Sequence, residues 1–107
     1  YEGIALDLDE RERLVRDLGD NNAMILRHHG LLTTGRTVGD AFYQMYYLEQ
    51  ACRLQLLAMQ SGQPLDPVPD HLARPVMEAV HSVHAYGDTF LTAVKRVLDK
   101  EEPDYRS

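Results

Sequence analysis

The chain has 107 residues, of which 44% are hydrophobic and 26% are charged, a balance typical of one soluble globular domain or of a piece of a larger one. Its formal net charge of -6, without a dense cluster of lysine and arginine, argues against a surface for nucleic acid or for an anionic membrane. No apolar run approaches the roughly 20 residues of a membrane span, no signal peptide is evident, and a single cysteine excludes a disulfide within the chain. We therefore expect a cytoplasmic protein.

A first helix is predicted after an extended segment formed by residues 1–8. Asp9 is a suitable N-cap with Glu12 three residues later, as in a capping box, and Gly19 supplies the left-handed residue that ends a helix. Helical spacing assigns the apolar face to Leu14, Val15 and Leu18, and the water-facing side to Glu10, Arg11, Arg13 and Arg16.

The stretch formed by residues 23–35 carries a pair of histidines. The apolar residues 24–26 predict a short buried strand that delivers His28 and His29 to its end, and residues 31–34 predict a second short strand. Because neighbouring side chains on an extended backbone point to opposite faces, one histidine can face a site while the other faces packing or solvent. Gly30 allows a sharp turn directly after them. The alternative is a polar turn with two surface histidines.

The longest helix is predicted over residues 38–61. Thr37 can cap it, with Asp40 at the third position, and the helix ends before Gly62. Apolar residues recur every three or four positions and form one stripe, made of Val38, Ala41, Phe42, Met45, Leu48, Cys52, Leu56 and Met59.

At 1.5 Å per residue this helix is about 36 Å long, enough to cross a sheet of several strands. Two short strands cannot supply such a sheet, so we expect the stripe to need cover from a missing N-terminal half or from another chain. Tyr43, Tyr46 and Tyr47 lie beside the stripe. We interpret them as aromatic packing at the edge of a core or in a subunit interface, the alternative being a substrate role.

Residues 62–70 read GQPLDPVPD and predict a proline-rich linker. A final helical region follows, and its apolar spacing indicates a packing element, with an interruption at Gly87 left open. Glu78, His81 and His84 stand at successive i, i+3 positions, as metal ligands on one helix face can. Because no second helix supplies further ligands, we interpret them as a solvated face. No internal repeat is evident.

These segments together resemble the C-terminal half of the class II aldolase/adducin family. The resemblance is carried by YEGIALDLDERERLVRDLG, ILRHHGLL and TVGDAFYQMYYLEQACRLQ in the right order, and more loosely by RVLDKEEPDYRS. It implies a three-layer α/β/α fold, to which residues 1–107 contribute short strands and three or four helices, including the long one. The chain begins at Tyr1 and not at a methionine, which agrees with the expectation that it is a fragment.

The resemblance also implies a chemistry. In the family, the histidine before the glycine is the third of three imidazole ligands of a divalent metal, usually zinc, and here that position is His29. A tyrosine near the chain end assists proton transfer in the aldolases, and Tyr86 of HAYGD lies at about the matching distance. The alternative is that Tyr86 packs in the final helix. The other two histidines and the catalytic glutamate belong to the half that is absent, so the fragment is incomplete for catalysis and can lack the metal.

Two function classes follow from the resemblance. The first is a metal-dependent aldolase, or a related epimerase, dehydratase or decarboxylase, acting on a small hydroxylated carbonyl compound such as a sugar phosphate. The second is a non-catalytic interaction and oligomerisation domain like the adducin head. In either case we expect no nucleic-acid or membrane partner, and a homo-oligomer, since family members commonly form ring-shaped tetramers with the active site between subunits.

Overall fold

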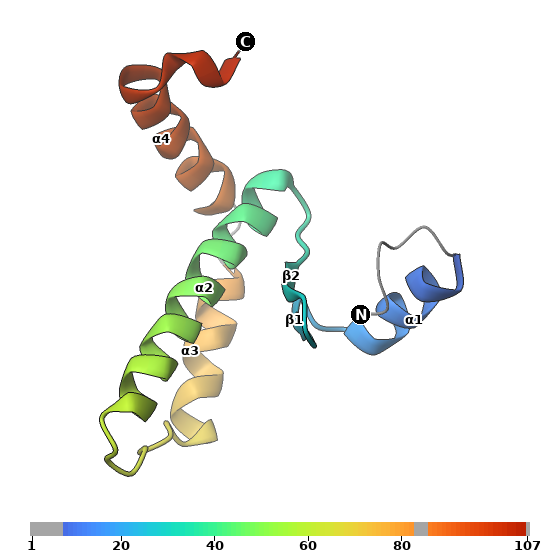
Figure 1. Cartoon of the computed structure of the whole chain (residues 1–107), viewed down its shortest axis with the longest axis vertical. Helices are drawn as coiled ribbons and strands as arrows, with labels where there is room; N and C mark the ends of the chain where they lie inside the picture. Colours follow the sequence, from blue (N-terminus) through green and yellow to red (C-terminus); the bar gives the residue numbers. More distant parts are fainter. Residues whose placement is uncertain (1–7, 83–85, 107) are drawn as a thin grey trace.

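The computed structural model describes residues 8–82 and 86–106 of the chain (Figure 1). Its elements are α1 (Leu8–Leu18), β1 (Ala23–Leu26), β2 (Gly30–Thr33), α2 (Val38–Gln60), α3 (Asp70–Ser82), α4 (Tyr86–Glu101) and the short 3-10 helix η1 (Pro103–Arg106). Figure 1 shows the β1–β2 hairpin between α1 and α2, with α4 projecting from the N-terminal end of α2. None of the helices in these two described ranges is both long enough and apolar enough to cross a membrane.

Helix α1 ends where the sequence predicts, but it begins earlier, and the residues buried on it differ from those predicted. Gly19 adopts a φ of 54°, and its N–H donates to the Val15 carbonyl at 3.1 Å, which confirms the left-handed end. The N-cap assignment of Asp9 is wrong, because the helix already includes Leu8.

The face assigned to α1 is also partly wrong. Glu10 is 7% exposed, whereas Val15 is 71% exposed. The reason is geometric: Glu10 stands four and eight residues before Leu14 and Leu18, so it shares their line along the helix, and both leucines are partly buried. Val15 lies to one side of that line.

The two predicted strands form an antiparallel hairpin with Ala23 opposite Thr33 and Leu26 opposite Gly30. The hairpin is fastened to α2 by hydrogen bonds: the Thr33 hydroxyl donates to the Ala41 carbonyl at 2.9 Å, and the Gln44 amide donates to the Thr34 carbonyl at 3.0 Å. The first strand is not buried as expected, since Ile25 is 70% exposed. Its outer face has no covering element among the described residues of this chain.

Helix α2 begins as predicted. Thr37 has an extended backbone, and its hydroxyl oxygen accepts a hydrogen bond from the Asp40 N–H at 3.1 Å, which confirms the cap. The helix ends at Gln60, after which Gly62 has a φ of 69°. As expected for a helix whose apolar stripe has no sheet to cover it, the C-terminal half of α2 exposes large apolar side chains, namely Leu54, Leu56, Leu57 and Met59. No hydrophobic residue is fully buried in the described part of the chain.

Residues 62–69 contain neither helix nor strand, and α3 begins at Asp70. Every residue of α3 from Asp70 to Val80 is exposed, so this helix also presents an apolar side to solvent. The final helical region is divided into α3 and α4, but Gly87 does not interrupt it. Gly87 is the second residue of α4 and is buried.

Candidate functional site

The two histidines lie in the turn of the hairpin. Residues 27–29 connect Leu26 to Gly30, and the His29 N–H donates to the Leu26 carbonyl at 3.1 Å. Reversing the chain over so few residues needs backbone conformations of positive φ, and His28 and Gly30 have φ values of 61° and 155°. The expectation of an extended backbone with the histidines on opposite faces is therefore wrong, and both side chains are exposed in this chain.

The described residues do not by themselves assemble a metal centre. No group of three His, Cys, Asp or Glu side chains among them is placed to hold an ion. His84 lies outside the described residues, and of the Glu78, His81 and His84 series only Glu78 has a described side chain, which is exposed. His29 can thus act as one ligand among others that this part of the chain does not supply.

A cluster of six aromatic side chains joins α2 to α4. We call it the aromatic cluster; it consists of Phe42, Tyr43, Tyr46 and Tyr47 from α2, and Tyr86 and Phe90 from α4. Phe90 packs against all four α2 rings, with centroid distances between 5.2 and 6.4 Å. The α2 tyrosines therefore take part in aromatic packing between two helices, whereas the predicted place of that packing, at the edge of a core or in a subunit interface, stays a prediction.

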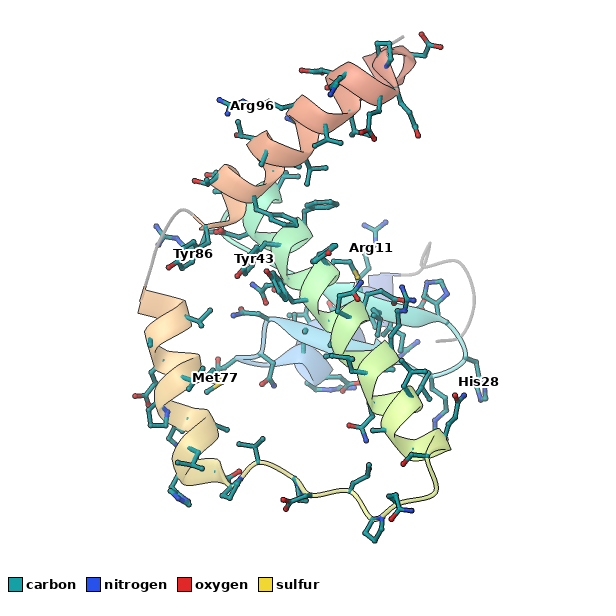
Figure 2. The ribbon with its side chains drawn as sticks, turned by 90° about the vertical axis from the view of Figure 1, so that its left-hand side faces the viewer. Arg11, His28, Tyr43, Met77, Tyr86 and Arg96 are labelled. Carbon is teal, nitrogen blue, oxygen red and sulfur yellow. The ribbon has the colours of Figure 1, made fainter. Side chains whose placement is uncertain are left out.

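Tyr86 is the first residue of α4 and lies at the rim of the aromatic cluster. Its ring is stacked on that of Tyr43, with a centroid distance of 6.4 Å and an interplanar angle of 16°. Figure 2 shows the two side chains next to each other. Tyr86 remains 49% exposed, so its hydroxyl can be reached from solvent. It is neither sealed in a core nor carried on a loose chain end.

Burial raises the pKa of the Tyr43 phenol above its ordinary value of 10.0, and the neighbouring phenols of Tyr47 and Tyr86 raise it further. Ionising Tyr43 would place a negative charge in a partly dry site beside other phenol oxygens. At neutral pH, Tyr43 is therefore a neutral hydroxyl next to Tyr86.

Next to Tyr86, the first turns of α2 and α4 make a close contact. The Thr37 hydroxyl, which caps α2, also donates to Asp88 Oδ1 at 2.8 Å. Gly39 and Gly87 are both buried at this contact. A Cβ atom on Gly39 would lie 2.7 Å from the Gly87 carbonyl carbon, so only glycine permits this approach.

The structure does not bring the two predicted site residues together within one chain. Figure 2 places Tyr86 and His28 on opposite sides of α2, and His29 belongs to the same turn as His28. The sequence predicted Thr37 only as the cap of α2 and left open an interruption at Gly87, so it missed the contact that Thr37, Asp88 and the two glycines make between the helices. The sequence does contain a signal for this contact, because Gly-Asp-x-Phe occurs at the start of both helices. We had expected no internal repeat.

The comparisons of this chain with a family model and with related proteins agree on one family. A family model described as the class II aldolase and adducin N-terminal domain matches residues 2–56. A Pseudomonas aeruginosa protein named after the class 2 aldolases is 36% identical over 111 residues, covering 99% of this chain and 43% of the relative. An adducin-related protein of Schizosaccharomyces pombe is 30% identical over 115 residues, covering 100% of this chain and 36% of the relative.

The solved structures give the same result. The crystal structure of an aldolase II superfamily protein from Pseudomonas syringae matches with a TM-score of 0.80 and 44% identity, covering 100% of this chain and 44% of that chain. This match confirms the predicted α/β fold class. The chain thus spans less than half the length of the relatives described here.

Proposed function

Because this chain belongs to the class II aldolase and adducin family, we propose that the intact protein is a cytoplasmic, metal-dependent lyase of the aldolase type. The resemblance to this family implies a divalent metal, a small-molecule substrate and a homo-oligomer, and we include all three in the proposal. The proposed substrate is a small hydroxylated carbonyl compound such as a sugar phosphate, in which a carbon–carbon bond next to a hydroxyl group is cleaved.

The proposal is carried by one observation: His29 stands immediately before Gly30 at an exposed hairpin turn, in a chain of this family. The His29 side chain is exposed at this turn, so a metal ion and a substrate can reach it. Zinc, when bound, would polarise the substrate oxygen and leave coordination positions open for it. The remaining ligands are proposed to come from the part of the family domain that this chain does not include.

Tyr86 is proposed to give the proton that the departing fragment needs. The Tyr86 residue is half exposed, and its ring is stacked on that of Tyr43, which stays protonated at neutral pH. Proton transfer from a positioned side chain typically contributes about 10²- to 10⁴-fold to a rate. The hydroxyl group that becomes a carbonyl releases its own proton to solvent as the carbon–carbon bond breaks, and the Tyr86 phenolate takes up a proton from solvent, so the step balances.

We further propose that His29 and Tyr86 of different copies share one site in a homo-oligomer, a tetramer by analogy with the family. The two residues lie on opposite sides of α2 in a single chain, and a closed ring places unlike faces of neighbouring copies against each other. The exposed apolar side chains of α2 are available for such contacts.

Mixing of two inactive variants tests this proposal. In the full-length protein, His29→Ala and Tyr86→Phe are each expected to abolish most of the release of dihydroxyacetone phosphate from ketose 1-phosphates. Co-expression in equal amounts should restore about one quarter of the wild-type activity. At a shared site, His29 is then intact in about half of the cases and Tyr86 of the neighbouring copy in about half, so both are intact in about one quarter. Full activity of either single variant would contradict the assigned role of that residue, and mixing without recovery would contradict the shared site.

A second function is favoured by the adducin-related protein of Schizosaccharomyces pombe, whose similarity extends over the whole chain. Here the domain would serve interaction and oligomerisation without catalysis. That function predicts an oligomer whose assembly is unchanged by His29→Ala and Tyr86→Phe, together with no release of product by the wild-type protein.

A further inference from the structure

The first turns of α2 and α4 have matching sequences. Residues 39–42 read Gly-Asp-Ala-Phe and residues 87–90 read Gly-Asp-Thr-Phe, and we call these the GDxF segments. In each helix the glycine is the second residue, the aspartate the third and the phenylalanine the fifth. Aspartate in a first turn is favourable because its charge compensates the positive end of the helix dipole.

The two GDxF segments pack against each other reciprocally. A Cβ atom on Gly39 would meet Asp88, with its backbone nitrogen 2.8 Å away, and a Cβ atom on Gly87 would meet Asp40, with its Cα 2.5 Å away. The rings of Phe42 and Phe90 then meet at 5.9 Å. Each glycine thus faces the aspartate of the other segment, as in a contact with approximate two-fold symmetry.

One residue breaks this symmetry. Thr37 precedes the first GDxF segment by two residues, and the corresponding residue before the second segment is Ala85, which has no hydroxyl. The Thr37 hydroxyl accepts from the Asp40 N–H at 3.1 Å and donates to Asp88 Oδ1 at 2.8 Å. A single side chain therefore caps α2 and holds the first turn of α4.

We propose that the paired GDxF segments form a joint that places Tyr86 at the rim of the aromatic cluster, with Thr37 and Asp88 as positioning residues. Tyr86 is two residues before Asp88 in the same helical turn, so fixing the Asp88 carboxylate fixes the start of α4. The ring of Tyr86 is then kept stacked on Tyr43. The consequence for turnover rests on the proposed role of Tyr86, whereas the joint itself does not.

Thr37→Asp separates the two tasks of this side chain. Aspartate is at least as good an N-cap as threonine, so α2 keeps its cap, but the new carboxylate cannot donate to Asp88 and repels it. Adding Asp88→Asn restores a donor, because the amide N–H₂ can donate to the new carboxylate. Thr37→Ser, which keeps the hydroxyl, is the conservative control.

The readout is the fluorine NMR spectrum of the full-length protein labelled with 3-fluorotyrosine, with the Tyr86 resonance assigned by its loss in Tyr86→Phe. We expect this resonance to shift in Thr37→Asp, to return to its original position in the Thr37→Asp/Asp88→Asn double variant, and to keep that position in Thr37→Ser. Turnover should fall about 10²-fold in Thr37→Asp and recover in the double variant, since small misplacements of a reacting group have effects of that size.

An unchanged Tyr86 resonance in Thr37→Asp would overturn the inference. A shifted resonance that the double variant fails to restore would also overturn it. Asp88→Asn restores the hydrogen bond to residue 37 but does not repair a general loss of helix stability, so a failure to restore the resonance would point to the latter. If Tyr86→Phe keeps full turnover, the proposed proton transfer is wrong, while the resonance still decides whether the joint positions Tyr86.

Discussion

Removal of the Phe90 ring tests whether the aromatic cluster is what holds α4 to α2. Phe90 packs against Phe42, Tyr43, Tyr46 and Tyr47, and it is partly buried. Phenylalanine-to-alanine changes in a full core cost about 3 to 5 kcal/mol. For a side chain that keeps part of its surface in water, we expect roughly half of this, about 2 kcal/mol.

Hydrogen exchange of the intact protein measures this cost where it arises. If α4 opens locally, 2 kcal/mol corresponds to roughly 30-fold faster exchange of its amides in Phe90→Ala. Val97→Ala is the matched control, because Val97 lies on the same helix, is 51% exposed and is outside the aromatic cluster. Its effect should be at most about fourfold. Equal exchange of α4 in the two variants would refute the assignment of α4 docking to the cluster, and the β1–β2 amides should be unchanged in both.

Two further predictions concern the same contact. Gly39→Ala should lower the stability by about 1 to 3 kcal/mol, because its Cβ would lie 2.7 Å from the Gly87 carbonyl carbon, and an unchanged Tm would contradict the close packing. The raised pKa of Tyr43 means that the fold favours the neutral phenol, so its contribution to stability is present below pH 10.0 and is lost as the pH rises through the folded-state pKa. The free energy of unfolding should fall less in Tyr43→Phe than in the wild type as the pH rises from below 10.0 to above the folded-state pKa. Identical pH profiles of the two proteins would exclude the assigned cause.

Features of the fold that depend on neighbouring residues could be predicted from the sequence. The α2 cap needs only Thr37 and the amide of Asp40, and the end of α1 needs only a glycine that tolerates a φ of 54°. The two strands followed from a short apolar run and the turn residues beside it. The lack of cover for the α2 stripe followed from comparing its length with the sheet available.

Features that depend on distant contacts could not be predicted in this way. The burial of Glu10 depends on which side of α1 is covered by other residues. The apolar pattern alone does not indicate that side, and it left Val15 and Leu14 equivalent. The place of Tyr86 depends on a hydrogen bond between Thr37 and Asp88, which are 51 residues apart. The recurrence of Gly-Asp-x-Phe was visible in the sequence, but its meaning depends on the angle at which the two helices meet.

The turn that carries His28 and His29 shows the limit for the candidate site itself. The family resemblance assigned the metal position to His29, which stands before Gly30, but it did not indicate the reversal that puts both histidines at the surface. That reversal follows from the pairing of Leu26 with Gly30, which leaves only three residues for the turn. The metal role of His29 remains a prediction.

Zinc titration by calorimetry of the intact, metal-stripped protein tests that role most directly. We expect one tight zinc site per protomer in the wild type and in His28→Ala, its loss in His29→Ala, and only weak binding by residues 1–107 alone, since one imidazole is too few to hold the ion. Tight one-to-one binding that survives His29→Ala would contradict the account.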